Sequence, residues 1–135
     1  MTFATACRRP PSATLLAAVR QFNEGAYFLC HETLEELWND KHDPLRDLYK
    51  GVLQIAIGLL HLEKGNTRGA RTLLERGTEL SRPMAPLCLG LELADLHAQV
   101  AEVIARIDRL EAPRPLSLED QRPQLRVSLQ EGRNP

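Results

Sequence analysis

The fold is decided by the stretch PLRDLYKGVLQIAIGLLHLEK, which covers residues 44–64. At about 100° per residue, its apolar side chains cover more than half of the circumference of an α-helix. A helix that is apolar on most sides is buried, so we expect this segment to be the central helix of a bundle. Gly51 and Gly58 lie one heptad apart on one side of it. Because glycine costs about 1 kcal/mol relative to alanine inside a helix, this pair predicts close approach by a neighbouring backbone.

Caps and helix breakers divide the rest of the chain into further helices. Four are expected in addition to the central one, over about residues 12–23, 26–39, 67–82 and 92–110. Ser12 is a candidate N-cap for the first of these, and Asn66 or Thr67 for the third. Strand-forming runs are nearly absent. The sequence therefore predicts an all-α fold, a compact bundle of about five mostly antiparallel helices with short connections.

Length and composition limit the classes of function. The 135 residues suffice for one domain, which we expect over residues 12–111, between an N-terminal tail (1–11) and a Pro-rich, flexible or disordered C-terminal tail (112–135). Seventeen basic and eighteen acidic residues give a net charge of −1. This balance does not support a nucleic-acid partner. No apolar run approaches the roughly 18 residues of a spanning helix, so no membrane partner is expected. A homo-oligomer is left open.

The cysteines indicate a reducing compartment. Cys7, Cys30 and Cys88 are odd in number and widely spaced, which favours neither a disulfide framework nor a zinc knuckle. Cys30 lies among apolar residues and is expected to be a small core side chain. The expectation is a soluble cytoplasmic protein with reduced thiols.

A polar cluster is predicted around His31-Glu32-Thr33-Leu34-Glu35. His31 and Glu35 are neighbours on one helix face, His31 buried and Glu35 at least half buried. If this face meets the central helix, His61 joins them, with Gln54 beside the group. Two imidazoles and one carboxylate suffice to hold a catalytic Zn or Mn ion, and Glu32 would then be the general base that polarises a bound water.

A purely structural interpretation competes with the metal site. A buried Glu35 needs a partner, and His31 or His61 could supply it without any metal. Trp38 lies on the apolar face and favours a core position. Lys50 is expected to extend along the surface, or to hold an anion at the mouth of the site. Together Gln54, Lys50 and Trp38 are the candidate ligand-binding residues.

The remaining histidines and the search for known motifs give less information about function. His42, in a loop, and His97, on the last helix, are interpreted as ordinary surface histidines. No histidine has a glutamate three positions before it, so the Glu-x-x-His pairs of di-iron bundles are missing. The sequence has no phosphate-binding loop, dinucleotide fingerprint or serine nucleophile elbow.

These stretches resemble the family known as domain of unknown function 309. The resemblance rests on Phe22-Asn23-x-Gly25-x-Tyr27-Phe28-x-x-His31-Glu32-x-Leu34-Glu35-x-x-Trp38, on Tyr49-x-Gly51-x-x-Gln54-x-Ala56, and on His61, Asn66, Gly69, Ala70 and Leu89-Gly90-Leu91. It covers about residues 15–110 and implies an all-helical fold found in bacteria and archaea. Members are sometimes labelled metal-dependent hydrolases, a label itself inferred from the motif. The positions it implies as a site are His31, Glu32, Glu35, Gln54 and His61.

Three functions remain open from the sequence. The first is a metal-dependent hydrolase at the histidine and glutamate cluster. The second is a non-enzymatic helical-hairpin interaction module, since Gly25-Ala26-Tyr27 and Gly69-Ala70 each open a helix in the manner of tetratricopeptide repeats. The third is a pocket for an anionic or polar metabolite without turnover. Bound metal would favour the first, and exposed apolar area on the fourth and fifth predicted helices, about residues 67–82 and 92–110, would favour the second.

Overall fold

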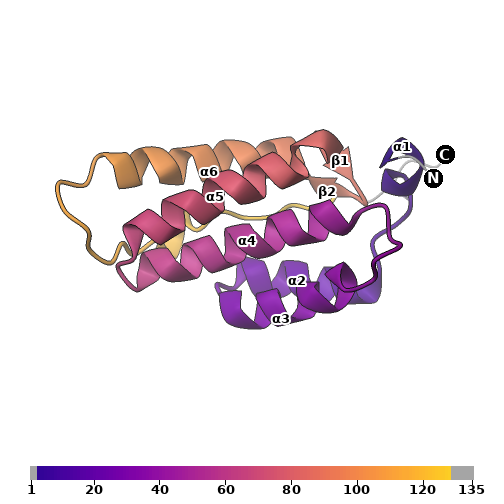
Figure 1. Ribbon diagram of the computed structural model, residues 1–135, viewed down its shortest axis with the longest axis horizontal. Helices are drawn as coiled ribbons and strands as arrows, with labels where there is room; N and C mark the ends of the chain where they lie inside the picture. Colours follow the sequence, from indigo (N-terminus) through magenta and orange to yellow (C-terminus); the bar gives the residue numbers. More distant parts are fainter. Residues whose placement is uncertain (1–2, 129–135) are drawn as a thin grey trace.

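The structure, a computed structural model, describes residues 3–128 and consists mainly of helices (Figure 1). Its elements in chain order are α1 (Phe3–Cys7), α2 (Ala13–Asn23), α3 (Tyr27–Trp38), α4 (Arg46–Glu63), α5 (Thr67–Ser81), the 3₁₀ turn η1 (Arg82–Met84), β1 (Leu87–Cys88), β2 (Leu91–Glu92), α6 (Leu93–Asp108) and the 3₁₀ turn η2 (Glu119–Gln121). The predicted helical bundle is confirmed. The short helix α1 and the hairpin β1–β2 were not predicted.

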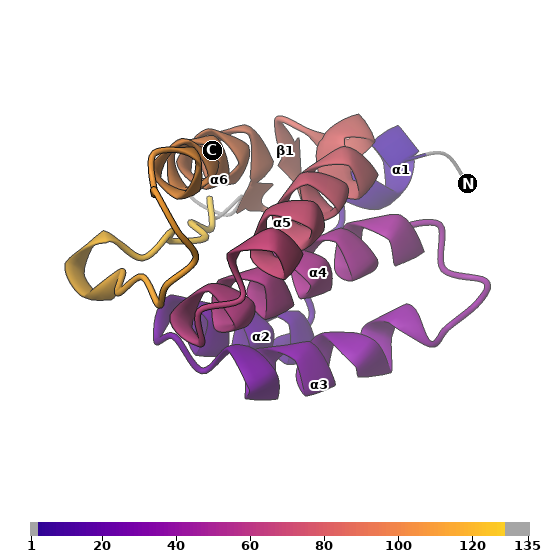
Figure 2. The same ribbon diagram turned by 60° about the vertical axis from the view of Figure 1, so that its left-hand side comes forward.

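The helix α4 is central, as the sequence predicts. In Figures 1 and 2 it lies between α5 and the pair α2–α3, while α6 packs on the far side of α5. Its fully buried side chains include Leu48, Ile55, Leu59 and Leu62. Among residues 3–128, no helix combines the length and apolar character needed to cross a membrane.

Glycines set the close approach of α4 and α5. A Cβ atom built on Gly51 would lie 2.7 Å from the carbonyl oxygen of Gly77, and one built on Gly77 would lie 2.5 Å from the oxygen of Gly51. A Cβ on Gly58 would lie 3.1 Å from the side chain of Leu74 on α5. The two backbones therefore touch where side chains are absent. The prediction drawn from Gly51 and Gly58 is confirmed.

Local chemistry fixes where the helices start. The Ser12 hydroxyl accepts a hydrogen bond from the Leu15 amide (3.1 Å), and the Asn66 side chain accepts one from the Gly69 amide (3.0 Å). These are N-cap interactions. Gly25 and Gly65 have φ angles of 82° and 92°, a left-handed conformation that favours glycine and that turns the chain between adjacent helices.

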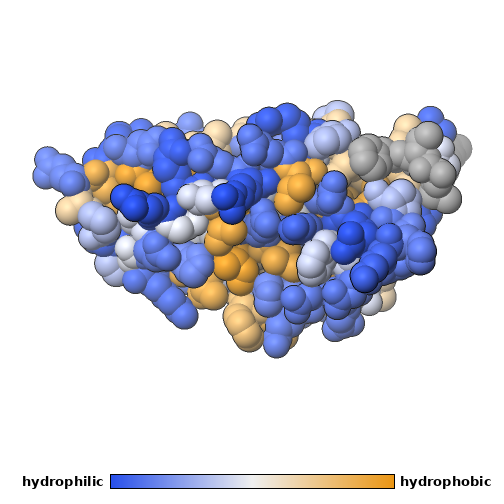
Figure 3. Space-filling view, viewed as in Figure 1, coloured by the Kyte–Doolittle hydropathy of each residue, from blue (hydrophilic) through white to orange (hydrophobic). Residues whose placement is uncertain are grey.

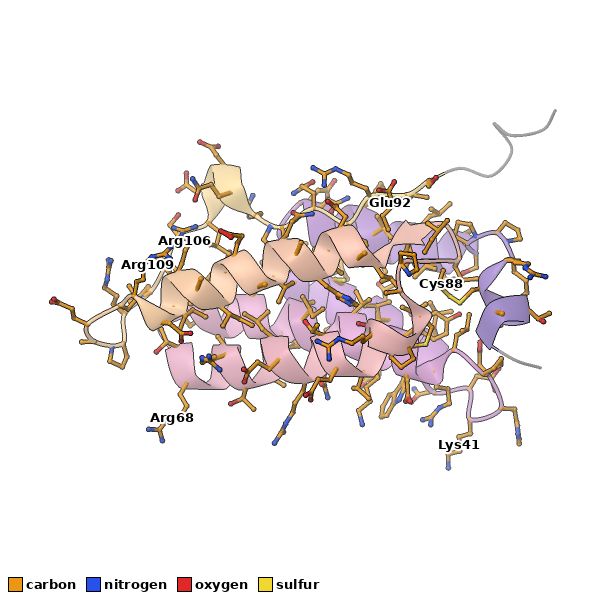
Figure 4. All side chains as sticks on the ribbon, turned by 90° about the horizontal axis from the view of Figure 1, so that it is seen from above. Lys41, Arg68, Cys88, Glu92, Arg106 and Arg109 are labelled. Atoms are coloured by element: carbon orange, nitrogen blue, oxygen red, sulfur yellow. A yellow bond between two sulfur atoms is a disulfide. The ribbon has the colours of Figure 1, made fainter. Side chains whose placement is uncertain are left out.

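Two cysteines are paired, contrary to the expectation of three reduced thiols. Cys7 at the end of α1 forms a disulfide with Cys88 on β1, and the two residues are 81 positions apart in the sequence. Cys88 is labelled in Figure 4. The Leu89 amide also donates to the Cys7 carbonyl (2.8 Å). Spacing along the chain could not reveal this pair, because only the folded hairpin β1–β2 brings Cys88 next to α1. The expected cytoplasmic location stays a prediction.

The segment 112–128, here called the strap, differs from the flexible tail that its prolines and charges suggest. It is extended but packed: Leu118 and Leu125 are each 2% exposed. Asn23 of α2 exchanges two hydrogen bonds with the backbone of Leu125, and Gln99 of α6 exchanges two with that of Gln124. The strap therefore ties α2 to α6. The remainder of the predicted tail, residues 129–135, lies outside the described residues.

Candidate functional site

The helix α3 supplies most of the predicted site residues and is held by one apolar side. Tyr27, Cys30 and Leu34 are buried there, and the Cys30 thiol donates to the Ala18 carbonyl of α2 (3.4 Å). Burial raises the pKa of Cys30 to about 12, so the thiol stays protonated near neutral pH. Cys30 is thus the small core side chain that the sequence predicts.

His31 and Glu35 lie together on α3, one turn apart. His31 Nε2 is 3.9 Å from Glu35 Oε2, which is ion-pair range but longer than a hydrogen bond. Their side chains are 24% and 46% exposed. Glu35 is therefore just over half buried, as predicted, whereas His31 is less buried than predicted. The buried atom of His31 is Nδ1, which has no hydrogen-bond partner within the described residues.

One predicted site residue of α4, Lys50, lies next to the C-terminal end of α3. The Lys50 ammonium is 5.4 Å from the centre of the Trp38 ring, and the Arg46 guanidinium is 5.1 Å from it. Arg46 also donates through Nε to the Trp38 carbonyl (2.8 Å). These contacts place the half-buried Trp38 between the core and two cations. Lys50 lies along this surface, in line with the expectation that it extends over apolar atoms.

Gln54 faces a different neighbour from His31. With Lys50 it lines a groove of about 410 Å³ whose other side, Arg76, Glu79 and Leu80, belongs to α5. Gln54 Oε1 is buried and finds no hydrogen-bond donor among residues 3–128. The predicted ligand-binding residues Gln54 and Lys50 thus share a groove, while Trp38 lies under Lys50 outside it.

The three predicted metal ligands do not form one cluster. His61 is half-buried near the end of α4, and residues 3–128 contain no group of three or more His, Cys, Asp or Glu side chains placed to hold a metal ion. His31 and Glu35 supply two donors, whereas catalytic zinc sites use three protein ligands. The side chains present therefore do not fit such a site. Glu32, the predicted general base, is exposed on the outer side of α3.

The outer side of α3 carries unexpected apolar side chains. Phe28 is 58% exposed and Leu29 is 50% exposed, and both lie on the same side as Glu32 and Glu36. Figure 3 shows apolar surface gathered over α4 and α3. We call Phe28, Leu29, Glu32, Glu35 and Glu36 the α3 face. Sequence reasoning missed this feature, although the signal was present: about 100° per residue places Phe28 and Leu29 away from the buried stripe.

His97 is not the ordinary surface histidine that the sequence suggests. It is partly buried, and Nε2 lies 2.8 Å from Ser81 Oγ, whose hydroxyl donates to the Gly77 carbonyl. Burial, with a contribution from the nearby Arg82 charge, lowers the pKa of His97 below its usual value. The missed signal is Ser81, a polar residue on the buried side of α5.

A cleft of about 760 Å³ lies between α5 and α6, beside His97. Its α6 wall is built from small apolar side chains, Ala94, Ala98 and Ala101, with Ile104. The α5 wall carries charges of both signs, among them Arg76 and Glu79. The cleft is separate from His31 and Glu35, so it does not complete the predicted site.

Taken together, the geometry defines a half-exposed polar cluster next to an apolar helix face. The residues between 15 and 73 that build it match the sequence model of the family described as domain of unknown function (DUF309). The resemblance to this family, which the sequence suggests over about residues 15–110, is therefore confirmed over residues 15–73.

Two curated relatives are similar to this chain. An uncharacterized protein, YpuF, of Bacillus subtilis is 33% identical over 89 residues, which cover 64% of this chain and 51% of that protein. An uncharacterized protein of Aquifex aeolicus is 25% identical over 84 residues, which cover 62% of this chain and 25% of that protein. The aligned segment is thus about half of the first relative's length and a quarter of the second's. Neither description states an activity.

Proposed function

We propose that this chain is a non-enzymatic helical binding module that recognises another protein through the α3 face. The observation that carries the proposal is the exposure of Phe28 and Leu29 on consecutive positions of one helix. Fully burying a side chain of this size contributes about 1.5–3 kcal/mol. Because Phe28 and Leu29 are each about half exposed, a partner that covers them could recover about half of that amount for each. Grouped apolar side chains with a polar rim are typical of protein interaction sites.

Hydrogen bonds to the polar residues near the α3 face would fix the orientation of a bound partner. The His31 ring lies beside that of Phe28, with ring centres 5.6 Å apart and the planes tilted by 34°, and Glu35 lies one turn further along α3. Both keep hydrogen-bonding capacity, because their mutual distance of 3.9 Å is too long for a hydrogen bond. A partner donor could therefore bond to the Glu35 carboxylate while its apolar side chains cover Phe28.

The test is a panel of three amphipathic model peptides added to the full chain. The peptides share one pattern of leucines and differ only in their polar residue, which is lysine, glutamine or glutamate. Amide chemical-shift changes in ¹⁵N-labelled protein then locate any binding site. We expect changes along α3 with at least one peptide and their loss in Phe28→Ser. Ala101→Ser, at an exposed position in the α6 wall of the cleft and away from α3, is the surface control.

The result against the proposal is equally specific. If no peptide shifts α3 amides, or if Phe28→Ser and Ala101→Ser behave alike, the α3 face is not a protein-binding surface. Unchanged unfolding midpoints for both variants would show that a loss of binding does not reflect a loss of structure.

The metal-dependent hydrolase stays a second candidate, favoured only by the His31–Glu35 pair on one helix face. Because the described residues offer no third ligand beside this pair, we derive no hydrolytic step from it. Titration calorimetry with Zn²⁺ and Mn²⁺ separates the two candidates. One equivalent bound by the wild type and lost in His31→Ala would favour a metal site, whereas no bound metal would favour the binding module.

A further inference from the structure

The charge of the α3 face indicates what kind of segment it binds. Resting on the function proposed above, we propose that its partner is a basic amphipathic helix that covers Phe28 and Leu29 and places Lys or Arg side chains beside the α3 glutamates.

The α3 face is acidic without compensation on its own helix. Residues 27–38 contain three glutamates, Glu32, Glu35 and Glu36, and no Lys or Arg. Glu32 and Glu36 are exposed and Glu35 is 46% exposed. The one ion-pair contact of these carboxylates within the described residues is the 3.9 Å approach of His31 to Glu35. The face therefore presents negative charge next to apolar surface.

The position of the glutamates along α3 strengthens this conclusion. Glu35 and Glu36 lie in the last turn of the helix, which has no basic residue, and Glu32 lies at its middle. The C-terminal end of a helix carries a partial negative charge, so carboxylates there are unfavourable and cations are favourable. A basic partner would interact with the side-chain carboxylates and with the helix end at once.

Nearby cations are engaged elsewhere. Arg46 and Lys50 lie over the Trp38 ring, and Arg46 is also bonded to the Trp38 carbonyl. Lys41, in the loop after α3, projects away from the bundle in Figure 4. In the part of the chain that the structure describes, none of these three lies within 4.0 Å of a glutamate carboxylate of α3.

A helix is the partner shape that suits this surface. The twelve residues of α3 give a straight ridge of about 18 Å, at roughly 1.5 Å per residue. A second helix along this ridge would present apolar residues every three or four positions to Phe28 and Leu29. Its flanking lysines or arginines would then lie within reach of Glu32 and Glu36.

The peptide panel tests the charge preference when affinity is measured by titration calorimetry at low and high salt. Exposed ion pairs contribute about 0.2–1 kcal/mol each, so pairs with the three α3 glutamates predict about tenfold tighter binding of the lysine peptide than of the glutamate peptide. Salt should reduce the difference because it screens exposed charges. Glu32→Lys should weaken binding of the lysine peptide by about fivefold, while the matched exposed control on α6, Glu102→Lys, should change it less than about twofold.

Each alternative outcome points to a different failure. If all three peptides bind α3 equally and Phe28→Ser abolishes binding, the binding module stands but the basic partner is wrong. If the glutamate peptide binds more tightly, or if Glu102→Lys acts like Glu32→Lys, the charge argument is wrong as well. If no peptide binds at α3, the inference and the function on which it rests both fall.

Discussion

The contact between α4 and α5 allows a quantitative prediction for Gly77→Ala. The added methyl group would lie 2.5 Å from the Gly51 carbonyl oxygen and 2.7 Å from Ile55 Cγ1. The first of these is a backbone atom of the central helix, so the strain cannot be relieved by rotating a side chain. The two helices must separate by several tenths of an ångström, and core contacts along α4 weaken with them.

The expected cost follows from two opposing terms. Overpacking a dense interface costs typically about 1–3 kcal/mol, and a clash with backbone favours the upper part of that range. Replacing glycine by alanine inside a helix returns about 1 kcal/mol. We therefore expect Gly77→Ala to lower the free energy of unfolding by about 1–2 kcal/mol.

Urea unfolding followed by circular dichroism measures this change, with Gly58→Ala as the matched control. A Cβ on Gly58 would lie 3.1 Å from two atoms of the Leu74 side chain, which can move, and 3.2 Å from the Ala70 carbonyl oxygen, a much looser backbone approach than the 2.5 Å at Gly77. Its cost should therefore be offset by the gain in helix propensity. Gly77→Ala should thus be clearly less stable than Gly58→Ala. If Gly77→Ala were as stable as the wild type, or if the two variants were equally destabilised, the backbone-contact argument would be refuted.

Three further predictions concern the strap, a histidine and the cysteines. Asn23→Ala removes both hydrogen bonds to the strap and should cost about 1–3 kcal/mol of stability and speed proteolysis within the strap; unchanged cleavage would contradict its docking. Burial lowers the pKa of His97 in the folded protein, so the unfolded chain binds this proton more readily. The contribution of the neutral imidazole to the free energy of unfolding should be fully present above 6.5, the pKa in the unfolded chain, and should be lost as the pH falls through the folded pKa. Urea unfolding across this range should show a smaller loss for His97→Gln, and an equal loss would exclude this histidine as a contributor. Mass spectrometry after alkylation should find one modified cysteine, Cys30, in unfolded unreduced protein and three after reduction; three without reduction would exclude the Cys7–Cys88 bond.

The candidate site shows how far helical periodicity reaches. The pattern around His31 and Glu35 correctly placed the two side chains on one face of one helix, because that relation depends only on the residue angle. It could not decide whether His61 would join them. That depends on the rotation of α4 about its own axis, which its contact with α5 sets through Gly51 and Gly77.

Expectations that depend on local sequence were correct across the fold, and those that depend on contacts between distant segments were not. The helices, their caps at Ser12 and Asn66 and the central position of α4 follow from local chemistry and apolar periodicity, which the sequence contains directly. The Cys7–Cys88 bond and the docking of the strap join residues that are distant in the chain. Such contacts form only after the helices have packed.

The sequence by itself determined a helical bundle around residues 44–64 and a polar motif on α3. The helical pattern places Phe28 and Leu29 away from the buried stripe of α3, but only the tertiary structure decided that this side stays uncovered. Cys30 and Leu34 meet neighbouring helices and leave Phe28 and Leu29 uncovered, because no other described element packs over that side to bury them. The proposed binding surface is therefore a consequence of packing, and the charge beside it is a consequence of sequence.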